Sequence, residues 1–165
     1  MAALTVGSQA PDFELRAMDG RRFVLRDELA HGPLVLAFFK VSCPTCQYAF
    51  PFLERLEQAY GHKGVRILGV SQNDPRETAN FTKEFGITFP VLLDDAHKYP
   101  VSNAYGLTNV PTIFWIAQGG QIELSSVGWV KVDFATLNKK MSESGSIPPA
   151  VIFHPGEDVR DFRAG

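Results

Sequence analysis

The hydrophobic and polar positions of this 165-residue chain follow the patterns of strands and helices in turn. Residues 33–39 are apolar throughout, as in a strand that is buried on both faces of a sheet. From residue 47 to residue 60 the apolar positions recur with helical spacing instead, at Phe52, Leu53, Leu56 and Ala59. The pattern therefore predicts a core strand that leads almost directly into a long helix.

Further elements are predicted on both sides of this pair. Upstream, residues 13–25 with an Asp19-Gly20 turn are typical of a β-hairpin, and residues 26–31 of a short helical turn. Downstream, the pattern predicts strands at 65–71, 90–93, 111–116 and 121–128, and helices at 75–85, 97–105 and 133–144, the last capped by Asp133. Strands that alternate with helices and close with a hairpin predict an α/β fold, a central mixed β-sheet flanked by helices.

One domain accounts for the chain, since this length suffices to bury a sizeable core. We assign that domain to residues 1–144. Residues 145–165, called the tail below, contain Pro148, Pro149 and Pro155, and we expect them to form an extended C-terminal arm.

Charge and hydropathy exclude several classes of partner. The chain has 16 basic and 18 acidic residues, a net charge of -2, which is not the basic footprint of a nucleic-acid-binding protein. No run of 18 apolar residues predicts a membrane span. Residues 1–8 lack the basic and apolar regions of a signal peptide, so the chain as it stands is expected to be cytoplasmic.

The two cysteines of the chain, Cys43 and Cys46, fall between the core strand and the long helix. The first turn of a helix has free N–H groups and a partial positive charge, and cysteine pKa values there fall to roughly 3.5–7.5. Cys43 is therefore the expected nucleophile, and Cys46, deeper in the helix, the resolving thiol. Lys40 either lowers the pKa of Cys43 through its charge or is simply an exposed lysine at the strand end.

Two other uses of the pair are less favoured. A structural disulfide across two residues would close too short a loop to stabilise the fold much. A zinc site needs further ligands, but there is no second C-x-x-C, and no H-x(3–5)-H pair occurs among His31, His62, His97 and His154. We therefore predict neither a metal nor a cofactor.

The order of these motifs resembles the thioredoxin superfamily. A strand precedes the C-x-x-C helix, Pro51 follows Cys46 by five residues, and Val110-Pro111-Thr112 precedes a β-hairpin. The opening stretch, residues 6–15, is similar to the redoxin branch, which contains TlpA/ResA-like thiol–disulfide oxidoreductases and AhpC/TSA peroxiredoxins. The resemblance covers residues 4 to about 144, and it implies a thioredoxin-like fold with an N-terminal hairpin extension and a βα insertion.

The same resemblance implies which residues contact a substrate. It implies a cis Val110–Pro111 bond facing the cysteines, with the Val110 backbone free to pair with an incoming peptide strand. Pro44 and Thr45, between the cysteines, are the other implied substrate contacts. The chain departs from the family pattern at Ser42, where a tryptophan is usual, in the Pro44-Thr45 dipeptide, and at Ala37 and Ala49, where related proteins place a buried acid.

The leading hypothesis is a thiol–disulfide oxidoreductase, monomeric or weakly dimeric. It would act on a protein thiol or disulfide and exchange electrons with an upstream donor or acceptor. A thiol peroxidase is the alternative, but the Pro-x-x-x-Thr-x-x-Cys motif fits neither cysteine, because Phe39 and Cys43, or Leu36 and Lys40, take the Pro and Thr places.

A non-enzymatic redox-sensing or Cu(I)-carrying module is a third class. Cu(I) prefers soft ligands, and Met18 and Met141 are distant from the pair in sequence. Trp129, just after the last predicted strand, is expected in the core, although the hairpin-to-helix junction could also bring it near the cysteines.

Overall fold

The structure, a computed structural model, describes residues 2–165. Its strands are β1 (Glu14–Ala17), β2 (Arg22–Val24), β3 (Leu34–Phe39), β4 (Arg66–Ser71), β5 (Val91–Leu93), β6 (Thr112–Ile116), β7 (Ile122–Val127), β8 (Trp129–Val130) and β9 (Phe162–Arg163). Its helices are α1 (Leu25–Leu29), α2 (Pro44–Tyr60), the 3-10 helix η1 (Gly61–Lys63), α3 (Pro75–Phe85), α4 (Pro100–Ala104) and α5 (Lys131–Gly145). The predicted alternation of strands and helices is confirmed.

Within residues 2–165, seven strands form one mixed sheet in the order β2-β1-β5-β4-β3-β6-β7. β3, β4 and β5 are parallel, whereas β6 pairs with β3 in antiparallel register, from Leu34 opposite Ile116 to Phe38 opposite Thr112. The N-terminal hairpin joins the same sheet, because β1 pairs with β5. The predicted α/β fold with its hairpin extension and βα insertion is therefore present.

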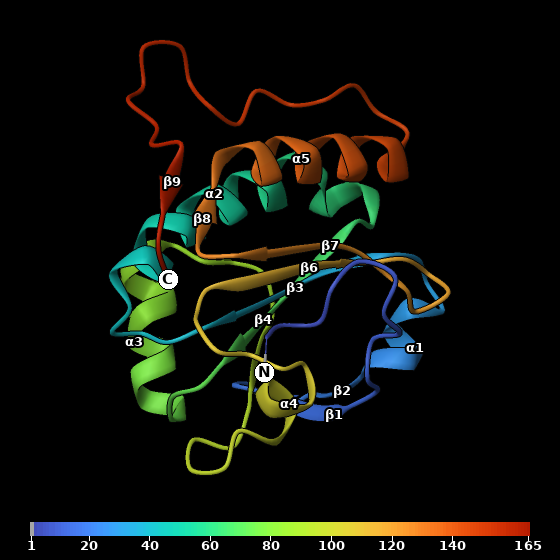
Figure 1. Ribbon diagram of the computed structural model, residues 1–165, viewed down its shortest axis with the longest axis vertical. Coiled ribbons are helices and arrows are strands. Elements are labelled where there is room, and N and C mark those ends of the chain that lie inside the picture. The colour runs from blue at the N-terminus through green and yellow to red at the C-terminus, as the bar shows by residue number, and fades with distance from the viewer. Residues whose placement is uncertain (1) are drawn as a thin grey trace.

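Side chains of β3 point alternately to two cores, one on each face of the sheet. Val35, Ala37 and Phe39 pack with side chains of α2, α3 and α5. Leu34, Leu36 and Phe38 pack with side chains of α1 and α4 on the opposite face. Figure 1 shows these helices in layers on either side of the sheet. All six β3 side chains are buried, which explains why this strand is apolar without alternation.

The start of α5 differs from the prediction. Asp133 was expected to cap this helix, but the helix begins two residues earlier and its N-cap is Val130. The Asp133 carboxylate lies in the first turn and accepts a hydrogen bond from Ser126 Oγ at 2.6 Å. The cap prediction is wrong because the short strand β8 runs directly into the helix, and Asp133 fastens the helix to β7 instead.

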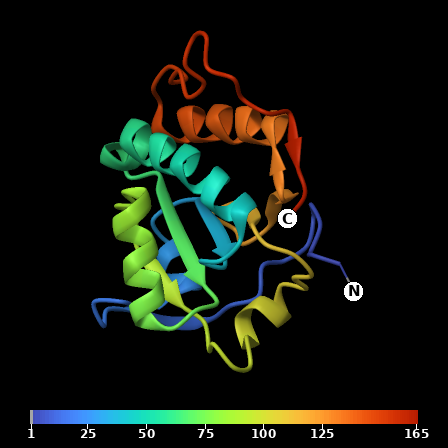
Figure 2. The same ribbon diagram turned by 90° about the vertical axis from the view of Figure 1, so that its left-hand side faces the viewer.

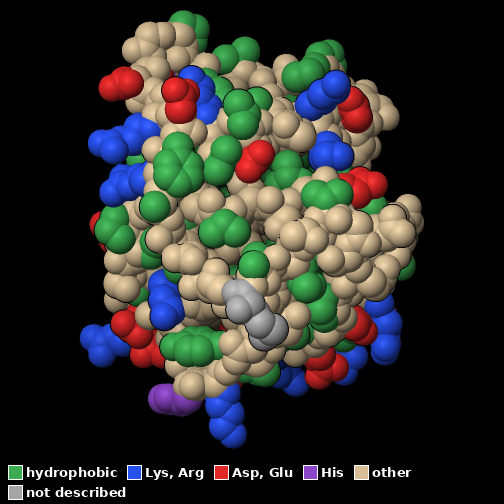
Figure 3. All heavy atoms as spheres, viewed as in Figure 1, with side chains coloured by type: hydrophobic (Ala, Val, Ile, Leu, Met, Phe, Trp, Pro, Cys, Tyr) green, Lys and Arg blue, Asp and Glu red, His purple; other side chains and the backbone are tan. Residues whose placement is uncertain are grey.

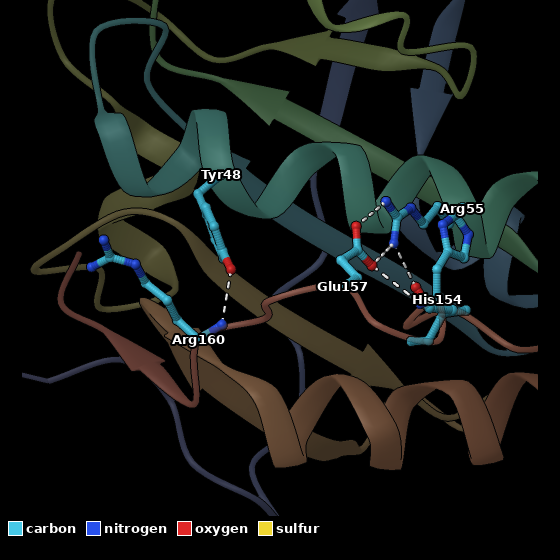
Figure 4. A network of polar contacts seen from close by, with 6 residues as sticks. Tyr48, Arg55, His154, Glu157 and Arg160 are labelled. Atoms are coloured by element: carbon cyan, nitrogen blue, oxygen red, sulfur yellow. Dashed lines mark hydrogen bonds and ion pairs between the residues drawn. The ribbon is translucent and has the colours of Figure 1, made fainter.

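The tail packs along α2 and α5 and has little regular structure before β9. Ile152 is buried in the larger core, and Arg55 of α2 donates to Ile152 O at 2.8 Å. The same guanidinium binds both carboxylate oxygens of Glu157 at 2.7 Å (Figure 4). The tail then turns back, so that the end of the chain lies beside the start of α2 (Figure 2).

The face seen in Figure 3 carries hydrophobic side chains dispersed among charged and polar groups. Large hydrophobic side chains that are exposed include Val132 and Val151, which are 70% and 72% exposed, and Phe162 of β9, which is 64% exposed. Dispersed apolar groups of this kind are ordinary on a folded protein.

Tyr60 anchors the tail from inside the protein. Its fully buried hydroxyl donates to Asn138 Oδ1 and accepts from the Ala150 amide at 2.8 Å. We expect Tyr60→Phe to lower the free energy of unfolding by about 1–3 kcal/mol, because it leaves buried polar groups unpaired. Urea denaturation measures this change, and Tyr99→Phe is the control, since the Tyr99 hydroxyl bonds to no other described residue. Equal losses in the two variants would contradict the anchoring role.

Candidate active site

Cys43 is the N-cap residue of α2. Its half-buried sulfur accepts a hydrogen bond from the Cys46 amide at 3.2 Å, and in the protonated form its thiol donates to Val110 O at 3.4 Å. A hydrogen bond from the Cys46 side chain lowers the pKa of Cys43 most, and the Cys46 and Thr45 amides and the charge of Arg163 lower it further. Burial opposes them, and the resulting pKa is about 6. Cys43 is therefore mostly thiolate at neutral pH.

Cys46 lies one turn further along α2 and is fully buried. Burial is the main cause that raises its pKa far above the usual value for cysteine, and the neighbouring Cys43 raises it further. One helical turn thus holds a partly exposed thiolate beside a buried thiol. The sequence predicted this difference in exposure, with Cys46 the more buried of the two sulfurs.

The loop before β6 faces this pair. The Val110–Pro111 bond is cis, the conformation that the family resemblance implied, and Val110 O is the atom that Cys43 contacts. Thr112 Oγ1 donates to Asn109 O at 2.7 Å and holds the loop in shape. The Val110 amide makes no hydrogen bond to any described residue, so it is free to pair with an incoming strand.

The ammonium of Lys40 lies over an aromatic ring, and Lys40 is not among the groups that lower the pKa of Cys43. Its ammonium lies 5.4 Å from the centre of the Tyr99 ring, in a cation–π contact. Both side chains line a cavity of about 210 Å³, which also reaches Val110. Lys40 is therefore partly buried at the strand end, in contact with Tyr99, and is not the exposed lysine of the second interpretation.

No carboxylate replaces the buried acid that related proteins place near the resolving thiol. Ala37 and Ala49 are both fully buried in the core beside Cys46. Across residues 2–165, no group of three or more His, Cys, Asp or Glu side chains is arranged to hold a metal ion. None of the helices in this part of the chain is both long and apolar enough to cross a membrane.

Comparison with known proteins agrees with this geometry. The model of the AhpC/TSA family matches residues 6–125. The chain belongs to this family.

Its relatives in the AhpC/TSA family include two bacterial proteins named thiol-disulfide oxidoreductase ResA. The protein of Geobacillus thermodenitrificans is 36% identical over 73% of this chain and 68% of its own length. That of Halalkalibacterium halodurans is 33% identical over 83% of this chain and 73% of its own length. A thiol:disulfide interchange protein of Chlorobium tepidum has a solved structure with a TM-score of 0.68 and 26% identity, over 84% of this chain and 99% of that one.

These relatives confirm the thioredoxin-like fold and the TlpA/ResA-like assignment predicted from the sequence. This AhpC/TSA member is a thiol–disulfide oxidoreductase, and it holds the Cys43–Cys46 pair at the start of α2. The identity of its substrates is a separate question.

Thr45 and Pro44 have unequal surroundings in this AhpC/TSA protein. Pro44 is exposed, whereas Thr45 is buried and its hydroxyl donates to Ala164 O at 2.6 Å. The sequence did not indicate that the tail reaches the redox pair. Trp129 lies in the core, as expected: it is fully buried against α2, and its indole donates to Arg160 O at 2.6 Å.

Cys43 should react as a low-pKa thiol. We expect its alkylation rate with iodoacetamide to rise through a midpoint near pH 6, while Cys46 stays unreactive in the folded protein. Cys46→Ala should raise that midpoint, because the largest cause of the low pKa is removed, whereas Cys46→Ser retains a hydroxyl donor and should shift it less. A wild-type midpoint at pH 8 or above would contradict this account of the site.

Arg163 should contribute to the same titration from the tail. Its guanidinium lies 5.7 Å from the centre of the Tyr48 ring, and its charge lowers the pKa of Cys43. We expect Arg163→Gln to raise the alkylation midpoint by less than about one pH unit, and Arg163→Lys to leave it nearly unchanged. Thiolate absorbance at 240 nm gives an independent titration. Equal midpoints in Arg163→Gln and wild type would exclude the charge effect.

Proposed function

We propose that Cys43 and Cys46 exchange electrons with disulfides or dithiols of other proteins. The observation that supports this most is the asymmetry of the pair, a partly exposed thiolate one turn from a buried thiol. An upstream dithiol or disulfide would return the pair to its starting state. The names of the relatives, thiol-disulfide oxidoreductase and thiol:disulfide interchange protein, agree with this chemistry.

Reduction of a substrate takes two exchange steps. The Cys43 thiolate attacks one sulfur of the substrate disulfide, forms a mixed disulfide and releases the other substrate sulfur as a thiolate. Cys46 then loses its proton to the departing substrate thiolate or to solvent and attacks Cys43 Sγ. The second substrate thiolate leaves, and two electrons have passed from the Cys43–Cys46 dithiol to the substrate. The same steps in reverse oxidise a substrate dithiol.

Val110 supplies the main contact for a protein substrate in this scheme. Its unpaired amide and its carbonyl lie beside Cys43, so an extended substrate segment can pair with this backbone while its cysteine reaches the Cys43 sulfur. Pro111 has no amide hydrogen to donate, so the backbone next to Val110 stays open to the substrate segment. The exposed Pro44, next to Cys43 in the chain, offers a further apolar surface to the substrate.

The surroundings of the cysteine pair do not favour the thiol peroxidase or the Cu(I) carrier. The Thr45 hydroxyl donates to the tail instead of pointing a hydrogen bond at Cys43, so it does not orient a peroxide there. A Cu(I) carrier would need a third soft ligand, but Met141 is fully buried in the core with α5, and Met18 lies in the turn of the N-terminal hairpin.

Three variants test the exchange mechanism. We expect the wild type to reduce insulin disulfides and to show a reversible two-electron couple, and Cys43→Ser to abolish both. Cys46→Ser should accumulate a mixed disulfide with the substrate through Cys43, which mass spectrometry detects. Ser42→Ala, next to the nucleophile but without a sulfur, is the control and should retain activity.

A single result would shift the assignment to a peroxidase. If the reduced wild type consumes hydrogen peroxide in stopped-flow measurements far faster than free cysteine does, and leaves insulin disulfides intact, the proposal is wrong.

A further inference from the structure

The tail returns across the protein and is fastened beside the redox pair. β9 pairs with β8 in antiparallel register, with Arg163 opposite Trp129. The Lys131 amide donates to Asp161 O at 2.9 Å, and Tyr48 of α2 accepts from the Arg160 amide at 3.0 Å (Figure 4). These contacts direct the residues that follow toward the first turn of α2.

Ala164 and Gly165 then lie between α2 and the cis-proline loop. On one side, Ala164 O accepts from the Thr45 hydroxyl at 2.6 Å. On the other, Gly165 O accepts from Asn109 Nδ2 at 3.4 Å. A methyl group added at Gly165 would lie 2.5 Å from Val110 O, so this backbone is closely packed against the loop.

The tail therefore contacts the backbone on which a protein substrate would pair. Thr45, between the cysteines, and Val110, before the cis proline, are the two sides of that surface, and residues 163–165 bridge them. We propose that residues 163–165 occupy part of the substrate-binding surface, so that a protein substrate must displace them whereas a small disulfide need not. This inference rests on the proposed function.

Access to Cys43 supports the distinction between the two kinds of substrate. Cys43 is only half-buried and its neighbours Ser42 and Pro44 are exposed, so a small disulfide reaches the sulfur with the tail in place. An extended protein segment needs the Val110 backbone as well, and Gly165 lies against it.

The tail end is also held weakly enough to be displaced. Ala164 and Gly165 are exposed, and Phe162 of β9 points mainly to solvent. The pairing of β8 with β9 spans only two residues on each strand. Segments with few buried contacts open at a small cost in free energy.

A substitution at Gly165 tests the proposal in the 165-residue chain. Gly165→Ala, and more strongly Gly165→Val, should push this residue away from Val110 O. The matched controls are Gly119→Ala and Gly119→Val, at a glycine where an added Cβ meets no atom within 4 Å. For each variant, kcat/KM is measured with insulin as the protein disulfide and with glutathione disulfide as the small one.

We expect the ratio of kcat/KM for insulin to kcat/KM for glutathione disulfide to rise roughly threefold to tenfold in the Gly165 variants, the effect of freeing one or two hydrogen bonds. The Gly119 variants should keep the wild-type ratio. An unchanged ratio in the Gly165 variants would refute displacement. A lowered ratio would also refute it and would make the tail a fixed part of the binding surface. If the wild type reduced neither disulfide, the proposed function itself would fail.

Hydrogen exchange on trapped complexes tests the same displacement without changing the tail. Cys46→Ser is linked through Cys43 either to a cysteine-containing peptide or to 2-mercaptoethanol. The peptide complex should lose protection in the paired strands β8 and β9, and the small adduct should retain it. Equal protection in both complexes would overturn the proposal.

Discussion

Burial of β3 on both faces is the constraint on which the site depends. Six consecutive apolar side chains fill two cores at once, and the helices of both layers pack against this strand. β3 ends at the edge of the sheet, and the chain turns there into α2. Cys43 lies at that turn because packing in the two cores holds β3 in place, and the end of β3 sets where α2 begins. The carboxyl edge of parallel strands is where ligands reach such sheets.

The chemistry of the cysteines follows from this placement. An N-cap position gives Cys43 hydrogen-bond donors that favour its thiolate, and one further turn takes Cys46 into the core, where the thiolate is disfavoured. The two sulfurs differ in pKa because they lie at different depths along one helix. Ala37 and Ala49, at the two positions where related proteins place a buried acid, offer no carboxylate to the proton of Cys46.

The tail gives this member of the family a particular active-site surface. It reinforces the core through Ile152 and the hydroxyl of Tyr60, and it ends against Thr45 and Val110. One segment thus both packs into the core and contacts the residues beside the cysteine pair. Arg163 adds a positive charge beside the nucleophile, so the tail influences the electrostatics of the pair as well as its surroundings.

The sequence by itself determined the fold class, most of the helices and strands, and the place of the cysteine pair between a core strand and a helix; it did not predict η1, β8 or β9. The periodicity of the apolar residues was sufficient for the elements that it predicted, because each of them buries apolar side chains. The C-x-x-C spacing was sufficient for the cysteine pair, because it places two thiols one helical turn apart. The cap at Asp133 was predicted wrongly, since a helix start also depends on the strand that enters it. Only the tertiary structure decided that Ala164 accepts from Thr45 and that Gly165 contacts Val110. These contacts join residues far apart in sequence, and the irregular, proline-containing tail has no periodicity from which its path could be predicted.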